Sequence, residues 1–215
     1  QMDTEEGCSA ISDTSGNLLF YTDGITVWNR NHQPMPTGNK TLWGDLSAPQ
    51  SALILSKPGN PGLYYIMTVD AQAGLGSGYG GLSYSLVNML KDGGLGDLDS
   101  LNIPLVTPTT EKISATLHYN GCDVWVMTHL WGSDAFCAYR ITASGFSAPV
   151  ISNVGSGHKD SGSGFRFETL GHLKFSPDGK KLVSAKDDYI SKGDGLELFD
   201  FDNRTIVVWF NAARF

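Results

Sequence analysis

Residues 12–28 read SDTSGNLLFYTDGITVW, and this stretch carries the pattern that predicts the fold. Turn-forming residues bracket the apolar run 18–22, and a second apolar run follows at 25–29. Short apolar runs that are separated by Gly, Asn and Asp are typical of β-hairpins. With the run at 8–12, the stretch predicts three consecutive strands joined by two tight bends.

Two glycines and two aspartates define those bends. Gly16 and Gly24 supply the positive φ that tight turns require, because glycine has no Cβ to clash. We expect Asp13 to cap the first turn and Asp23 to cap the second, each through its carboxylate. On this interpretation the two aspartates form turns and take part in no chemistry.

The same arrangement of strands recurs along the chain. Asn120-Gly121 and Pro177-Asp178-Gly179 separate apolar runs as hairpin turns do. A fourth strand is expected to close each unit, at 40–44, 103–107, 147–153 and 205–210. The predicted units are 8–44, 51–107, 113–154 and 170–210. A repeat of this length is that of a four-stranded propeller blade.

The side-chain pattern also favours blades. The runs 18–21, 52–55 and 64–67 are apolar at every position, whereas a strand exposed on one face alternates. A strand between two neighbouring blades is covered on both faces. Segment 82–91 also fits one face of a helix, and its place in the repeat favours a strand. We predict an all-β, β-propeller-like single domain over 1–215, with about four units of four antiparallel strands.

Composition excludes several functions. The net charge is −7 and there is no basic run, which argues against nucleic acid as a partner. No segment is apolar enough for a membrane helix, and residues 1–10 lack the features of a signal peptide. Cys8, Cys122 and Cys137 form no CxxC pair, so we expect free, buried thiols and no zinc site.

Several segments resemble the propeller domains of large secreted bacterial surface proteins of the gliding-motility-associated or type IX secretion sorting-domain kind. The matching segments are EGCSAISDTSGNLLFYTDGITVWNRNHQPMP, QSALILSKPGNPGLYYIMTVDA, GGLSYSLVNM, NIPLVTPTTEKISAT and LKFSPDGKKLVSA. The last also resembles WD40-like and TolB-like blades. The resemblance implies an extracellular or cell-surface location, further domains in the same polypeptide and no established catalysis. Family propellers have more blades, so we expect this one to be incomplete.

Motifs for catalysis and metal binding are weak. The run from Asp23 to Trp28 is similar to the Asp-box of sialidases, but its Gly and Thr stand one residue too early. Asp200, Asp202 and Asn203 lie close together, as calcium ligands do, without the rest of a calcium loop. A solvated hairpin with an Asx-turn is the favoured interpretation there. We therefore predict no catalytic residues, no metal site and no cofactor, with calcium as the one weak alternative.

The histidines show no metal-binding spacing. His118 and His172 fall in the first strands of their units, where we expect their rings to be packed. His129 and His158 are expected in loops, where they are freer to contact a ligand.

Loop length selects the candidate binding face. The loops 69–81, 128–134, 155–167 and 186–195 are long and should emerge at one end, opposite the tight turns. The candidate ligand-binding residues on them are Asp70, Tyr79, His129, Trp131, Asp134, His158, Arg166, Asp187 and Tyr189. We expect a non-enzymatic scaffold, or an adhesion module that binds an extracellular glycan or a surface protein. The alternatives are a hydrolase or lyase acting on polysaccharide and an inert spacer.

Overall fold

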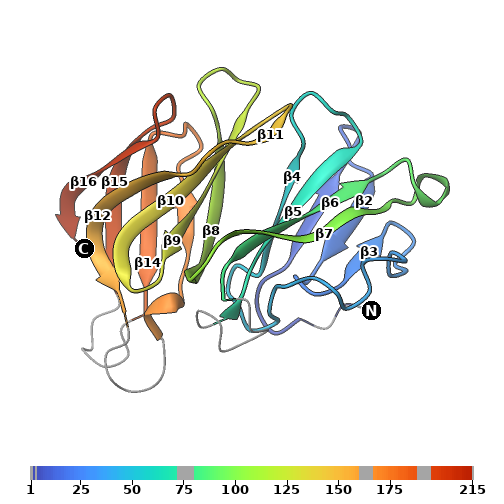
Figure 1. Cartoon of the computed structure of the whole chain (residues 1–215), viewed down its shortest axis with the longest axis horizontal. Helices are drawn as coiled ribbons and strands as arrows, with labels where there is room; N and C mark the ends of the chain where they lie inside the picture. Colours follow the sequence, from blue (N-terminus) through green and yellow to red (C-terminus); the bar gives the residue numbers. More distant parts are fainter. Residues whose placement is uncertain (1, 3, 72–79, 160–166, 188–194, 215) are drawn as a thin grey trace.

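A computed structural model describes residues 2, 4–71, 80–159, 167–187 and 195–214 (Figure 1). Over these residues the chain is all-β and forms four antiparallel sheets, arranged as the blades of a β-propeller. The first sheet contains β1 (Ser9–Ser12), β2 (Leu18–Thr22) and β3 (Val27–Asn29). The second contains β4 (Ala52–Ser56), β5 (Leu63–Val69), β6 (Leu82–Asn88) and β7 (Asp97–Val106). The prediction of an all-β propeller is confirmed.

The third and fourth sheets follow the same order of strands. The third contains β8 (Thr109–Leu117), β9 (Val124–Leu130), β10 (Ser133–Thr142), β11 (Gly145–Phe146) and β12 (Val150–His158). The fourth contains β13 (Leu173–Phe175), β14 (Lys181–Lys186), β15 (Gly195–Asp202) and β16 (Val207–Arg214). Two short 3-10 turns, η2 (Asp92–Gly94) and η3 (Phe167–Thr169), complete the described elements. Segment 82–91 begins as strand β6, as the repeat predicts.

The turns of the first sheet form as their residues predict. The Asp13 carboxylate accepts hydrogen bonds from the backbone N–H groups of Ser15 and Asn17. Asp23 Oδ1 accepts from the N–H groups of Ile25 and Thr26, at 2.9 and 2.7 Å. Both aspartates therefore cap turns, and these carboxylates stabilise backbone donors that the strands leave unpaired.

Three apolar cores lie between successive sheets. Phe20, Ile54 and Ile66 belong to the core that joins the first and second sheets. Tyr65 and Met67, which alternate with Ile66 along β5, face the second core instead, where they meet the third sheet. The third core joins the last two sheets. Strands covered on both faces are thus apolar at every position, which explains the unbroken runs in the sequence.

The predicted fourth strand at 40–44 is wrong, since the first sheet has three described strands and this segment is a loop. The side chain of Asn102, from β7 of the second sheet, donates to the Thr41 carbonyl at 2.6 Å and accepts from the Trp43 N–H at 3.1 Å. Backbone groups that a strand ladder would use are taken by this amide. Lys40 also has φ +57°, outside the β region.

Three further expectations need correction. The segment 128–134 is no long loop: β9 runs to Leu130, β10 starts at Ser133, and a tight turn joins them. The third sheet has five strands, because both β11 and β12 pair with β10. All three cysteines are free, as predicted, but Cys8 and Cys122 are exposed and only Cys137 is buried.

Candidate functional site

The structure describes six of the nine candidate ligand-binding residues. All six lie at one end of the molecule, where β5, β9, β12 and β14 finish and β10 begins. They are Asp70, His129, Trp131, Asp134, His158 and Asp187. Tyr79, Arg166 and Tyr189 lie outside the described residues.

Two of these residues are unsuited to contact a ligand. His129 and His158 are 1% and 0% exposed, and their rings stack at 3.8 Å between centroids. His129 lies within β9 and His158 closes β12, so neither belongs to a loop. The expectation that their rings are free is therefore wrong. Burial lowers the pKa of His129 to about 3 and moves the pKa of His158 well below its ordinary value, so both rings are neutral.

Lys112 lies beside this buried pair of histidines, and no pattern in the sequence marks Lys112 as buried. Its side chain, on β8, is fully buried. The Nζ atom donates to the Glu168 carbonyl at 2.9 Å and lies 3.2 Å from His158 Nδ1. Burial lowers the pKa of Lys112 to about 7, partly offset by the nearby Glu111 carboxylate. This amine fixes η3 and the end of β12 against β8.

Two carboxylates among the six residues accept hydrogen bonds from the backbone or from a neighbouring side chain. Asp70 is buried and accepts from the N–H groups of Ala71 and Gly80, which closes the loop between β5 and β6. Asp134 accepts from the Asn153 side chain at 2.9 Å. Trp131 is half-buried, and its backbone N–H donates to the Pro108 carbonyl at 3.1 Å.

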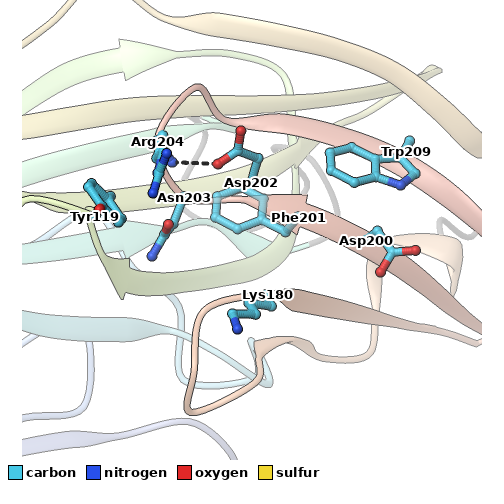
Figure 2. Close-up of a pocket in the computed structure, with 8 residues that line it drawn as sticks. All are labelled: Tyr119, Lys180, Asp200, Phe201, Asp202, Asn203, Arg204 and Trp209. Atoms are coloured by element: carbon cyan, nitrogen blue, oxygen red, sulfur yellow. Dashed lines mark hydrogen bonds between the residues drawn. The ribbon is translucent and has the colours of Figure 1, made fainter.

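A mixed polar and aromatic surface lies at the other end, among the tight turns. Figure 2 shows this tight-turn hollow, of about 510 Å³, between the third and fourth sheets. The β8–β9 turn, the β13–β14 turn and the β15–β16 hairpin contribute to it. Its lining residues are Tyr119, Lys180, Asp200, Phe201, Asp202, Asn203, Arg204 and Trp209.

Asn203 fixes the shape of the tight-turn hollow. Its backbone carbonyl accepts from the indole N–H of Trp125 at 2.9 Å and from the Tyr119 N–H at 3.2 Å. Its side-chain amide donates to the Leu117 carbonyl at 3.3 Å. The hairpin of the fourth sheet is thus bound to the turn of the third sheet, and the residues on both keep a fixed relative position.

Exposed aromatic rings border the tight-turn hollow. Tyr119 is 62% exposed and Trp209 is 47% exposed, which is unusual for side chains of their size. The Arg204 guanidinium lies 3.7 Å above the Tyr119 ring and holds it in place by a cation–π contact. Phe201, which is buried, also lines the hollow and lies between Tyr119 and Trp209 in the view of Figure 2.

The carboxylates of the tight-turn hollow are engaged locally. Asp202 accepts from the Arg204 N–H and from the Thr205 hydroxyl, both at 2.9 Å, which is the predicted Asx-turn. These hydrogen bonds lower the pKa of Asp202, so it stays ionised at neutral pH. Asp200 forms an ion pair with Lys181 on the adjacent strand. The two acids and the two bases that line the hollow leave it with no net charge.

Two of the remaining histidines differ from each other. His118 is buried and its Nδ1 accepts from the Asn120 N–H, as expected of a packed ring. His172 is exposed, so the expectation of a packed ring is wrong there. Among the described residues, no group of three or more His, Cys, Asp or Glu side chains is placed to hold a metal ion. No helix of the described chain has the length and apolar character needed to cross a bilayer.

Comparisons with known proteins identify no family. No family model matches the sequence. No curated protein matches it either. Among solved structures, the chain is similar to the β-propeller domain of the Trilobed protease from Pyrococcus furiosus, described as having an open velcro topology, with 12% identity and a TM-score of 0.28. The match covers 77% of this chain and 43% of that one, and no activity or ligand is transferred from it.

Proposed function

We propose that this chain is a non-enzymatic recognition module of a secreted or cell-surface protein, and that it binds an uncharged glycan in the tight-turn hollow. The observation that carries the proposal is the pair of exposed rings, Tyr119 and Trp209, around a hollow with no net charge. Sugar rings present apolar C–H faces and polar edges. Aromatic rings flanked by amide and carboxylate oxygens match both features.

The ionised state of the Asp202 carboxylate favours binding of the glycan without cleavage. Glycoside hydrolysis needs a carboxylic acid that holds its proton near neutral pH, together with a second carboxylate. The pKa of Asp202 is lowered, and its oxygens already accept two hydrogen bonds. A hydrolase or lyase on this surface is therefore the less favoured proposal.

The cellular setting is part of the same proposal. The surface-protein location, the association with gliding motility or type IX secretion, and further domains in one polypeptide are all supported by the sequence resemblance alone. An adhesion module must hold its ligand-binding surface rigidly, and the hydrogen bonds of Asn203 provide such rigidity here. A scaffold role without any ligand predicts no binding at this surface.

A screen against neutral oligosaccharides, followed by calorimetry on the hits, tests the proposal. We expect Trp209→Ala and Tyr119→Ala each to weaken binding at least about tenfold, which corresponds to about 1.4 kcal/mol. Trp131→Ala, which removes the same kind of ring at the other end, should leave the affinity unchanged. The wild-type chain should leave the bound sugar unaltered, as mass spectrometry of the recovered ligand will show.

Two results would contradict the proposal. One is the absence of binding across the whole neutral panel. The other is equal loss of affinity in Trp131→Ala and Trp209→Ala when both proteins remain folded by circular dichroism. Release of shortened saccharide by the wild-type chain would instead support the enzymatic alternative.

A further inference from the structure

The first strands of all four sheets line one cavity, separate from the tight-turn hollow. This axial cavity has a volume of about 610 Å³. Residues from β1, β4, β8 and β13, with the segments that precede β1, β4 and β13, form its wall. The volume lies within the range of small-molecule sites, and every sheet contributes to it.

Much of the polar wall of the axial cavity is already used by the protein. Gln50 accepts from the N–H groups of Ile113 and Leu173 and donates to the Leu173 carbonyl. Ser9 Oγ accepts from the Ile54 N–H, and Ser114 Oγ accepts from the Phe175 N–H. These groups hold the four first strands together.

Three ionisable side chains of the wall remain available. Glu6, His172 and Lys174 make no side-chain hydrogen bond or ion pair within the portion of the chain that the structure describes. Each is exposed and lines the cavity. A site with a carboxylate, an imidazole and an ammonium group presents charges of both signs.

Backbone contacts fix where these three groups stand. Gly7 packs so closely against the segment before β4 that a Cβ would lie 2.6 Å from the Ser51 N atom. This contact, with the hydrogen bond from the Glu6 N–H to the Leu46 carbonyl, places Glu6 at the wall. His172 and Lys174 flank the buried Leu173, so by strand alternation both side chains face the same side.

Glu6 and His172 are near enough to interact. Burial raises the pKa of Glu6, the neighbouring Glu5 carboxylate adds to this effect, and His172 opposes it. Leu53, Ile113 and Phe175 supply an apolar wall beside the charged groups. A ligand that carries an ammonium group, a carboxylate and an apolar side chain satisfies all of these features.

We propose that the axial cavity binds a small zwitterion, an α-amino acid or short peptide with free ends. Glu6 receives the ligand's ammonium group. Lys174 and His172 receive its carboxylate. The apolar side chain of the ligand lies against Leu53 and Phe175. The axial cavity and the tight-turn hollow share no residue, so this proposal stands independently of glycan binding.

Calorimetry with phenylalanine and phenylalanyl-phenylalanine tests the proposal directly. N-acetyl-phenylalanine lacks the ammonium group and phenylalaninamide lacks the carboxylate, so each should bind at least about tenfold more weakly. Glu6→Gln and Lys174→Gln should each cause a loss of the same size. Asp92→Asn, which removes an exposed carboxylate from η2 and lies outside the cavity wall, is the matched control and should leave the affinity unchanged.

Three results would overturn the proposal. They are no binding of either zwitterion, equal binding of the blocked forms, or wild-type affinity in Glu6→Gln. The substituted side chains are exposed, so all variants should fold, and circular dichroism will verify this. A second readout is the rate at which a thiol reagent labels the exposed Cys8. Bound phenylalanine should slow this labelling, because Cys8 lines the same cavity.

Discussion

At the scale of single residues, the buried trio Lys112, His129 and His158 links protonation to stability. All three side chains are nearly or fully inaccessible, and water cannot solvate their charged forms. The structure therefore stabilises the neutral imidazoles, and it stabilises a lysine that loses its proton near neutral pH.

The histidines predict a loss of stability in acid. The pKa of His129 is about 3 in the folded protein and 6.5 when exposed, so the unfolded chain takes up a proton first as the pH falls. The free energy of unfolding should fall by about 1.4 kcal/mol per pH unit for each such histidine below pH 6.5. Urea unfolding of wild type and His129→Phe across this range will measure it. An equal slope in both proteins would contradict the assignment.

Lys112 predicts that the free energy of unfolding also depends on pH above 7. Its pKa is about 7 in the folded protein and 10.5 when exposed, so between these values the unfolded chain holds the extra proton. Stability should therefore rise with pH in this window, by up to about 1.4 kcal/mol per pH unit. The Lys112→Met variant should lack this rise. Urea unfolding at several pH values above 7 compares the two, and a parallel rise would contradict the prediction.

Gly24 and Gly16 offer a matched test of two turns. Both have positive φ, at +93° and +86°. A Cβ at Gly24 would lie 1.8 Å from Ser51 Oγ, whereas nothing lies within 4 Å of one at Gly16. Gly16→Ala should cost about 1–2 kcal/mol through φ alone. Gly24→Ala should cost clearly more, and equal costs in chemical unfolding would contradict this contact.

At the scale of elements, Gln50 connects β8 and β13 across the centre of the molecule. Its buried amide takes part in three backbone hydrogen bonds to those strands. Replacement by an apolar side chain leaves buried N–H and C=O groups without partners. Each of these costs about 1–3 kcal/mol.

Gln50→Leu should therefore destabilise the fold by about 3 kcal/mol or more. Gln33→Leu, at an exposed amide, is the control and should stay within about 0.5 kcal/mol of wild type. Thermal and urea unfolding of both variants will measure the difference. Equal stability of the two variants would contradict the central role of Gln50.

The sequence predicts strands better than it predicts the contacts between sheets. Asn120-Gly121 and the caps of Asp13 and Asp23 are local, so their turns form as expected. Segment 40–44 fails because its partner, Asn102, is some 60 residues away. No local pattern shows that this side chain takes the backbone groups of another unit.

The tight-turn hollow could not be predicted from the sequence either, because it depends on contacts between segments that are far apart in the chain. Loop length favours the end that holds His129 and His158, but both rings are buried there, where they stack on each other and Lys112 contacts His158. Tyr119 and Trp209 border the same hollow because Asn203 binds the β8–β9 turn to the β15–β16 hairpin. The run 206–210 is apolar at every position, so no alternation in the sequence marks Trp209 as the exposed residue.

At the scale of the whole molecule, the three cores make the sheets depend on one another. The second sheet directs Ile66 into one core and Met67 into the next, and the third sheet likewise faces two cores. Loss of packing in one core therefore loosens a sheet that the adjacent core also needs. This arrangement favours unfolding in a single cooperative transition.

Ile66→Ala should lower stability by about 2–5 kcal/mol, the usual cost of a large buried deletion. It should shift the whole transition, including the tryptophan fluorescence, to which Trp125 in the core between the last two sheets contributes. Far-ultraviolet circular dichroism and tryptophan fluorescence will be recorded together. Separate midpoints for the two signals would show that the sheets unfold independently.

The three thiols make the molecule suited to site-resolved labelling without new cysteines. Cys8 borders the axial cavity, and Cys122 follows the turn that carries Tyr119. Burial raises the pKa of Cys137 to about 11, which keeps that thiol protonated and shielded from maleimide dyes. A Cys8→Ser or Cys122→Ser variant therefore leaves one reactive thiol. A fluorophore on that thiol reports occupancy of one site at a time in the intact chain.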